Sequence, residues 1–186
     1  MEIKYRFALD KNDNLIDVSE LNRSNLSKDD KFYSIDCHNE LIPKLGEVVT
    51  KHFAHKGDSE GNYESYLHAL AKKVFADEYQ KCLNEKKPFL FKYKVDNKCE
   101  RLNSLGVACI DTEYKFFDLT TKFDQLFIEK RDGNFIPDVM LYNSQKGDKI
   151  YIEIAVTHFC EDDKINSGNR IIEFSIQKED DINIIL

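Results

Sequence analysis

The chain has 186 residues, of which 41% are hydrophobic, and it carries a formal net charge of −7. This size allows one substantial core and one small additional module, and no apolar run approaches the roughly 20 residues of a membrane helix. The net acidity argues against a protein that coats DNA non-specifically, because phosphate binding requires clustered lysine and arginine.

The N-terminal residues 1–10 alternate charged and apolar side chains, without the long apolar run of a signal peptide. The cysteines are odd in number and scattered, and no CxxC motif occurs, so we expect no disulfide framework. These features favour a reducing, cytoplasmic location without a membrane partner. The cysteines are Cys37, Cys82, Cys99, Cys109 and Cys160.

Short strands and turns are predicted for residues 1–35. Ile3, Tyr5 and Phe7 alternate with charged neighbours, as in a half-buried strand. Residues 56–63 contain two glycines and no aliphatic side chain, which is typical of a linker. We therefore predict a β-rich module at 1–58 and a second domain at 62–186.

A Cys/His motif with the spacing S-x2-C-x14-H-x2-H lies in the first module. Its members are Ser34, Cys37, His52 and His55. A cysteine at the first position would complete a zinc site of two cysteines and two histidines. Serine leaves Cys37, His52 and His55 as Zn²⁺ ligands, with Asp36 or His38 as candidates for the fourth. A degenerate zinc ribbon without metal, in which the histidines pack and form hydrogen bonds, is an equal alternative.

A helix is predicted from about residue 64 to 84, because apolar side chains recur every three or four residues and Pro88 follows. Glu64, His68 and Lys72 share one face of it. One interpretation is that all three are functional groups. The other is that Glu64 is simply favoured by the helix dipole in the first turn, and that the histidine and lysine are exposed.

Residues 72–101 are locally basic, with nine Lys or Arg against five Asp or Glu. A solvated surface is one interpretation, and a nucleic-acid track is the other. The lysines proposed to contact nucleic acid are Lys86, Lys87, Lys92 and Lys94.

The rest of the chain is predicted to consist mainly of strands. Residues 89–95 are predicted to form a strand, and 99–110 are a weaker candidate for another. Residues 123–130 and 134–142 form a hairpin around Asp132-Gly133, a pair that favours tight turns. Residues 149–157 form a buried strand, 161–167 a helix or turn, and 170–176 a final strand.

Glu153 interrupts the apolar strand 149–157, where an acid costs free energy unless it is paired or binds a metal. Asp138 lies on the preceding strand, and neighbouring antiparallel strands can bring the two carboxylates to one cation such as Mg²⁺. Alternatively, Glu153 pairs with a lysine or lies on an edge strand. Asp138 and Glu153 by themselves favour neither the metal site nor this alternative.

His52-Phe53-Ala54-His55, followed by the Glu-led helix 64–72, resembles the competence protein CoiA-like family. That family resembles nucleases of the PD-(D/E)xK, or restriction-endonuclease-like, class. The resemblance covers roughly residues 34–173. It implies an α/β (α+β) fold: a central mixed β-sheet flanked by helices, preceded by a small β-rich, zinc-ribbon-like module.

The resemblance also implies roles for single residues. Asp138 and Glu153 would bind Mg²⁺ or Mn²⁺, the backbone carbonyl of Ile154 would add a ligand, and Glu64 would act through water or position the cation.

The class expects lysine at position 155, where this chain has Ala155. Lys164 is our candidate for the missing lysine, with His158 as a rival or a general base. Alternatively, Lys164 is an exposed side chain that neutralises the acids at 161–163.

The leading hypothesis is a metal-dependent nuclease that hydrolyses DNA in uptake, processing or defence. The second is a catalytically inactive nuclease-fold module that binds nucleic acid or a partner protein; a homodimer is also considered. A hydrolase built on Cys160 and His158 has little weight, since no oxyanion-hole pattern is present. Residues 180–186 end on apolar side chains, so a further C-terminal part that binds nucleic acid is also considered.

Overall fold

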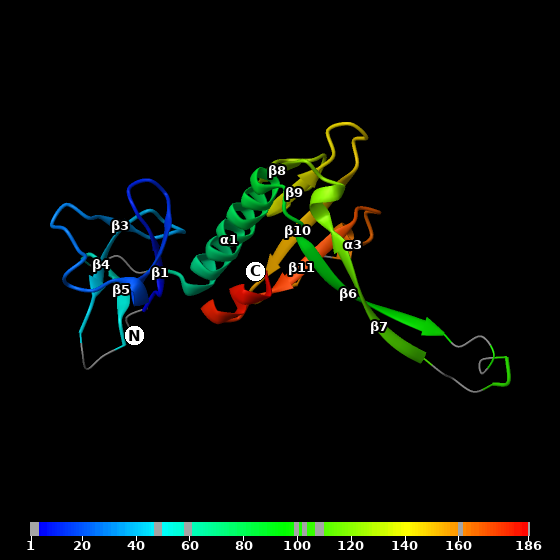
Figure 1. Cartoon of the computed structure of the whole chain (residues 1–186), viewed down its shortest axis with the longest axis horizontal. Helices are drawn as coiled ribbons and strands as arrows, with labels where there is room; N and C mark the ends of the chain where they lie inside the picture. The colour runs from blue at the N-terminus through cyan, green and yellow to red at the C-terminus, as the bar shows by residue number, and fades with distance from the viewer. Residues whose placement is uncertain are drawn as a thin grey trace.

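The structure is a computed structural model that describes residues 4–46, 50–57, 61–98, 101, 104–106, 110–159 and 162–185. These residues form a mixed α/β structure with several sheets and few helices. In Figure 1 the long helix α1 (Tyr63–Glu85) runs from a five-stranded N-terminal sheet across a four-stranded sheet, and a two-stranded hairpin projects from this body. Within the described ranges, no helix is long and apolar enough to cross a membrane.

The N-terminal sheet is antiparallel, with the order β2-β1-β3-β4-β5. Its strands are β1 (Phe7–Leu9), β2 (Leu15–Asp17), β3 (Phe32–Tyr33), β4 (Glu40–Lys44) and β5 (His52–His55). Tyr5, just before β1, exchanges two backbone hydrogen bonds with Phe53 of β5 at 3.1 and 2.7 Å. The first and last parts of the sheet are therefore joined, and the sheet curls around the buried Tyr5 and Phe53 side chains.

Helix α1 agrees with the prediction to within one residue at each end. The Asn62 side chain caps its start by accepting a hydrogen bond from the Ser65 N–H at 3.1 Å. Lys86 ends it in the left-handed conformation, at φ 56°, and its N–H bonds back to the Cys82 carbonyl. The predicted apolar stripe is buried. Its members are Leu67, Leu70, Ala71, Val74 and Phe75.

The four-stranded sheet has the order β11-β10-β9-β8. Its strands are β8 (Gln125–Ile128), β9 (Val139–Tyr142), β10 (Lys149–Ala155) and β11 (Ile171–Ser175). The pairs β8/β9 and β9/β10 are antiparallel, whereas β10 and β11 are parallel. Parallel neighbours need a crossover, and the segment containing α3 (Asp162–Ile165) provides it.

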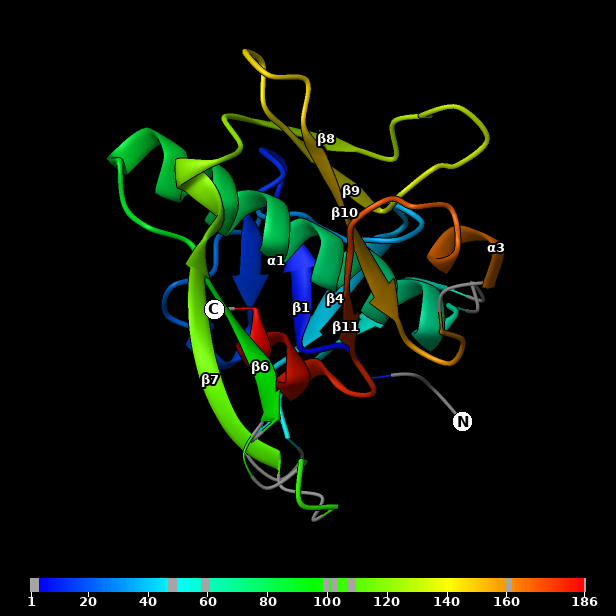
Figure 2. The same cartoon turned by 90° about the vertical axis from the view of Figure 1, so that its right-hand side faces the viewer.

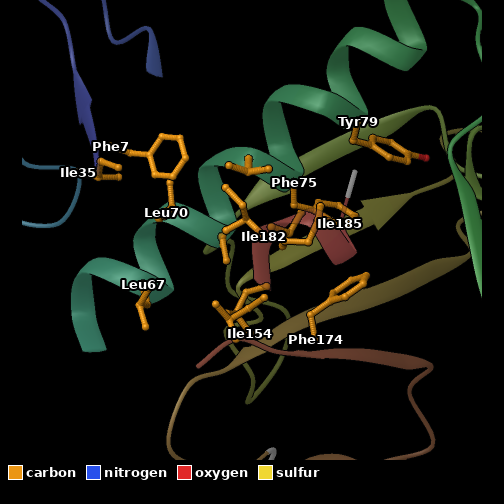
Figure 3. Close-up of a cluster of buried hydrophobic side chains, with 14 of the residues drawn as sticks. Phe7, Ile35, Leu67, Leu70, Phe75, Tyr79, Ile154, Phe174, Ile182 and Ile185 are labelled. Carbon is orange, nitrogen blue, oxygen red and sulfur yellow. The ribbon is translucent and has the colours of Figure 1, made fainter. Parts of the chain in front are cut away.

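One face of this sheet packs against α1. Ile150, Ile152 and Ile154 of β10 belong to the same apolar core as the helix. Figure 3 shows Ile154 and Phe174 of the sheet beside Phe75 and Leu67 of α1. Because side chains alternate along a strand, Glu153 lies on the opposite face of β10.

The predicted hairpin around Asp132-Gly133 is confirmed as a pairing of neighbouring strands, but its strands are shorter than expected. Ile128 pairs with Val139, and residues 129–138 form a loop between them. Within this loop, Asp132 and Phe135 exchange backbone hydrogen bonds around Gly133, whose φ is +61°. Pro137 lacks an N–H group and cannot extend the ladder as a donor.

The projecting hairpin consists of β6 (Leu90–Lys98) and β7 (Ile110–Asp118), paired antiparallel. Figure 2 shows both strands extending beyond the rest of the molecule. Strand β6 corresponds to the predicted strand 89–95. Strand β7 was not predicted, and much of the weaker candidate 99–110 lies outside the described residues.

The C-terminal 3₁₀ helix η3 (Glu179–Ile184) connects the two halves of the molecule. Glu179 accepts hydrogen bonds from the Arg6 N–H at 2.7 Å and from the Tyr66 hydroxyl at 2.6 Å. The Tyr66 hydroxyl also accepts a bond from the Phe7 N–H at 3.1 Å. One buried hydroxyl thus links the first strand, the long helix and the C-terminal turn.

We expect Tyr66→Phe to lower the free energy of unfolding by about 1–3 kcal/mol, because it leaves buried polar groups without a partner. Urea unfolding followed by circular dichroism measures this. Tyr114→Phe, at an exposed tyrosine on β7, is the matched control and should stay within about 0.5 kcal/mol of the wild type. Equal stability of the two variants would contradict the linking role of Tyr66.

Candidate metal and nuclease site

Asp138 lies at the start of β9, where α1 and β10 approach each other. Its Oδ2 atom accepts a hydrogen bond from the Ile154 N–H at 2.8 Å and one from His68 Nε2 at 3.0 Å. Lys72 Nζ lies 3.9 Å from the other carboxylate oxygen, Oδ1. One carboxylate therefore joins the helix to the central strand.

The pKa of Asp138 is lowered despite its burial. Burial disfavours the charged form, but the hydrogen bonds from His68 and Ile154 and the charge of Lys72 outweigh that effect. Asp138 is consequently a carboxylate at neutral pH and can serve as a ligand for a cation.

Glu153 lies in the middle of β10, where the sequence places it, and is almost completely buried. Lys164 Nζ lies 2.6 Å from Glu153 Oε1, and both side chains are less than 15% exposed. The Lys164 ammonium is therefore the counter-ion of this buried oxygen atom. Burial raises the pKa of Glu153, Lys164 opposes this rise, and the charge of Asp138 adds to it.

Two adjoining clefts surround the pair. The first, which we call the acid-pair cleft, has a volume of about 460 Å³ and is lined by Asp138, Glu153, Lys164 and Glu173 among others. The second, the Glu64 cleft, has a volume of about 480 Å³. Both are lined by His68, Ile154 and His158, so they form neighbouring parts of one groove.

Glu64 lies in the second cleft, where its carboxylate accepts a hydrogen bond from the Thr157 hydroxyl just after β10. Asp36 of the N-terminal module lines the same cleft, and the buried Ser34 hydroxyl donates a hydrogen bond to it. The N-terminal module thus contributes a side chain to the groove. His158 is exposed and lines both clefts.

The predicted replacement for the motif lysine reaches the acid pair, since Lys164 contacts Glu153. Ala155 itself is 4% exposed, and its carbonyl accepts a hydrogen bond from the Ile176 N–H at 2.8 Å. An alanine side chain carries no charge, so the positive charges beside the pair come from α1 and α3.

The groove also contains His68, Lys72 and Glu173, which the sequence patterns did not assign to the site. His68 and Lys72 follow Glu64 at intervals of four on one helix face, and this spacing was the available signal. Glu173 is in register with Glu153 in the parallel pair of β10 and β11. That relation depends on the crossover, which no local sequence pattern reveals.

The proposed zinc ligands of the first module do not converge in the described structure. Cys37 is exposed, His55 Nε2 lies 3.2 Å from the Tyr5 hydroxyl, and His52 Nδ1 lies 2.9 Å from the Thr50 carbonyl. Three positions along a strand place His52 and His55 on opposite faces. Among the described residues, no three His, Cys, Asp or Glu are grouped to hold a metal ion. Zinc binding stays a prediction, which the metal content of the purified protein can decide.

The proposed nucleic-acid lysines lie near the far end of α1. Lys86 follows its last residue, roughly 27 Å along the axis from His68 at 1.5 Å per residue. Lys87 pairs with Glu85 at 2.6 Å. On the hairpin, Lys92 Nζ lies 4.4 Å from the centre of the Tyr114 ring, and Lys94 pairs with Asp96 at 3.4 Å. These lysines are separate from the acid pair, and Cys160 lies outside the described residues.

We expect Lys164→Ala to destabilise the fold at neutral pH by about 1–3 kcal/mol, because it leaves the Glu153 carboxylate without its counter-ion. A buried carboxyl with a raised pKa stabilises the fold below its unfolded pKa and loses that contribution as pH rises through the folded pKa. The loss in the variant should therefore be small near pH 4 and grow towards pH 7.

Urea unfolding at both pH values tests this expectation. Lys81→Ala, which removes an exposed ion pair with Glu78 on α1, is the matched control and should change stability by less than about 1 kcal/mol. A destabilisation by Lys164→Ala that does not depend on pH would contradict the role of Lys164 as counter-ion.

Comparison with known families adds one match. Residues 16–64 match the family model of the competence protein CoiA, N-terminal domain. The matched segment runs from β2 to the start of α1 and includes His52, His55 and Glu64, but it ends before Asp138 and Glu153. No curated protein and no solved structure matches the chain. The match supports the CoiA-like resemblance drawn from the sequence.

Proposed function

We propose that the protein is a divalent-metal-dependent nuclease that hydrolyses DNA phosphodiester bonds, with Asp138 and Glu153 as ligands of Mg²⁺ or Mn²⁺. The proposal rests on one observation: two partly desolvated carboxylates, Asp138 just before β9 and Glu153 on β10, line one cleft. The CoiA match, whose name refers to competence, favours a role in DNA uptake.

The donor atoms are of the kind that such an ion prefers. Glu153 Oε1 is buried, and Lys72 Nζ lies 3.9 Å from Asp138 Oδ1. The Lys164 ammonium lies against Glu153 Oε1, so the site already attracts a positive charge. Hard divalent ions prefer carboxylate and carbonyl oxygens, and the Ile154 carbonyl is the candidate for a third ligand.

The arrangement of elements supports the same proposal. A mixed sheet with α1 on one face is part of the arrangement that the sequence resemblance implies, a central mixed sheet flanked by helices. In that core, the acid pair would come from adjacent strands, and Asp138 and Glu153 come from the start of β9 and from β10.

A bound divalent ion would orient a water molecule, lower its pKa and offset the charge that builds on the phosphodiester. The chain's own residues would prepare the site. His68 and the Ile154 N–H hold Asp138 in one orientation. Lys164 supplies a positive charge beside Glu153, in place of the lysine missing at 155. Glu64 would position water in the adjoining cleft, and exposed His158 is a candidate base.

We expect Asp138→Ala and Glu153→Ala each to reduce Mg²⁺- or Mn²⁺-dependent cleavage of DNA by more than about 100-fold. His68→Ala should lower it by about 10–100-fold, the usual cost of losing a partner of a metal ligand. Cleavage of labelled DNA is measured with each ion and with EDTA.

Asp148→Ala, at an exposed acid in the turn between β9 and β10, is the control and should cleave as the wild type does. Cleavage that survives both ligand substitutions, or that persists in EDTA, would reject the proposal.

A second candidate is a non-catalytic module that binds nucleic acid, and Ala155 together with the β6–β7 hairpin favours it. One face of this hairpin carries Lys92 and Lys94 beside the exposed Tyr114 and Phe116. Lysines interleaved with aromatic rings suit phosphate contacts and base stacking.

This candidate predicts binding that does not need metal and weakens as salt rises. Lys92→Ala with Lys94→Ala should lower the slope of log affinity against log salt by roughly one for each phosphate that a lysine neutralises. Fluorescence anisotropy with labelled DNA measures the slope, and absence of binding at low salt would count against this function.

A further inference from the structure

Apolar side chains from two segments line the acid-pair cleft. Phe159, between β10 and α3, is 73% exposed, and Ile136, in the loop between β8 and β9, is 49% exposed. The half-buried Phe135 lies beside Ile136, and all three line the cleft that holds Asp138 and Glu153. Exposed apolar groups that border a polar cleft indicate a ligand with flat apolar surfaces.

The wall that contains Phe135 is held in place. Asp132 and Phe135 exchange backbone hydrogen bonds at 2.9 and 3.1 Å. The Asp132 carboxylate also accepts a hydrogen bond from the Tyr151 hydroxyl at 2.5 Å and pairs with Lys149. The backbone at Phe135 is therefore held in position, so this part of the cleft is largely preformed.

The charges of the cleft do not suit a DNA duplex. Asp138, Glu153 and Glu173 line it. Of its basic side chains, Lys164 contacts Glu153 and His68 contacts Asp138, and His158 is the third. Duplex binding depends largely on lysine and arginine that replace counter-ions along the phosphates. Affinity in this cleft must therefore come largely from contacts with bases.

Bases in a duplex are stacked on each other and must be flipped out before a protein ring can reach them. An unpaired strand exposes the face of each base, and stacking on an aromatic side chain contributes to binding whatever the base is. A cleft with an exposed phenylalanine beside an acid pair fits the unpaired strand.

We infer that the acid-pair cleft takes an unpaired DNA strand, with a base stacked on Phe159 and the neighbouring phosphate over Asp138 and Glu153. Phe135 and Ile136, which line the same cleft, contact the strand as well. This inference rests on the proposed nuclease function and names its substrate class. Phe159 is then the residue that distinguishes unpaired from paired DNA.

Binding by the full chain is measured by fluorescence anisotropy with Ca²⁺ present, because a hard divalent ion on the two carboxylates offsets their repulsion of the phosphate. The probes are a labelled oligothymidylate and a blunt duplex of the same length. The wild type should bind the unpaired strand more tightly. Phe159→Ala should weaken that binding by roughly 5- to 100-fold, as expected when one stacking ring is removed, and should leave duplex binding unchanged. Phe159→Tyr keeps a ring and should bind as the wild type does.

Ile184→Ala, at an exposed apolar residue of η3 (65%), is the control and should bind as the wild type does. Phe116→Ala, on β7 (63%), tests the β6–β7 hairpin separately. All three positions are exposed, so each variant should fold, and circular dichroism verifies this. Equal affinity of the wild type for the two DNAs, or unchanged binding of the unpaired strand by Phe159→Ala, would overturn the inference. So would weaker binding by Phe116→Ala alone, because it would place the strand on the β6–β7 hairpin.

Cleavage with Mg²⁺ and Mn²⁺ is scored separately. If the wild type binds the unpaired strand through Phe159 but does not cleave it, the nuclease proposal is rejected and the inferred binding specificity is supported. A wild type that cuts paired and unpaired DNA equally supports the nuclease proposal and overturns the choice of substrate.

Discussion

The burial of helix α1 holds the molecule together, because one apolar stripe serves both the N-terminal sheet and the four-stranded sheet. Near its start, the Tyr66 ring contacts that of Tyr5, with centres 4.6 Å apart. Further along, Phe75 packs against Phe174 of β11, with centres 6.0 Å apart. Each such side chain contributes about 1.5–3 kcal/mol through burial. The polar face of the same helix carries His68 into the groove, so the geometry of the site depends on core packing.

Asp138 extends this dependence to the chemistry of the groove. Its Oδ2 atom is bonded to His68 on α1 and to the Ile154 N–H on β10, while the Ile154 side chain packs in the core. A shift of the helix against the sheet would break one of these bonds. A carboxylate fixed by rigid elements in this way is suited to holding a ligand in one place.

Local patterns were sufficient to predict much of the central unit. The apolar stripe of 64–84 predicted α1, and the β-branched run 149–157 predicted β10. The run 171–175 is also extended as predicted. These segments each bury one face, so their periodicity is strong. Strand β7 has no comparable signal, because most of its length projects into solvent, where packing does not select the side chains.

The residues of the site could be predicted only in part, because some of them come together through contacts between segments that are far apart in the chain. The proximity of Asp138 and Glu153 follows from an antiparallel pairing of consecutive strands, which a sequence can suggest. The contact of Asp36 with the groove depends on how the first module docks on α1, and the alignment of Glu173 with Glu153 depends on a parallel crossover. Both relations join segments far apart in the chain and leave no local pattern.

The two carboxylates of the pair have opposite electrostatic tendencies, although they are neighbours. Hydrogen bonds outweigh burial at Asp138 and lower its pKa, whereas burial and the charge of Asp138 raise the pKa of Glu153. Neighbouring acids whose pKa values are driven apart are typical of sites that perform chemistry.

Because Glu153 is buried, its ionised form needs a cation beside it, and Lys164 is that cation. In the proposed nuclease, a divalent ion would neutralise the same carboxylate, and the Lys164 ammonium would then be available to the phosphate. In that arrangement, Lys164 would supply the positive charge that Ala155 cannot provide at the motif position.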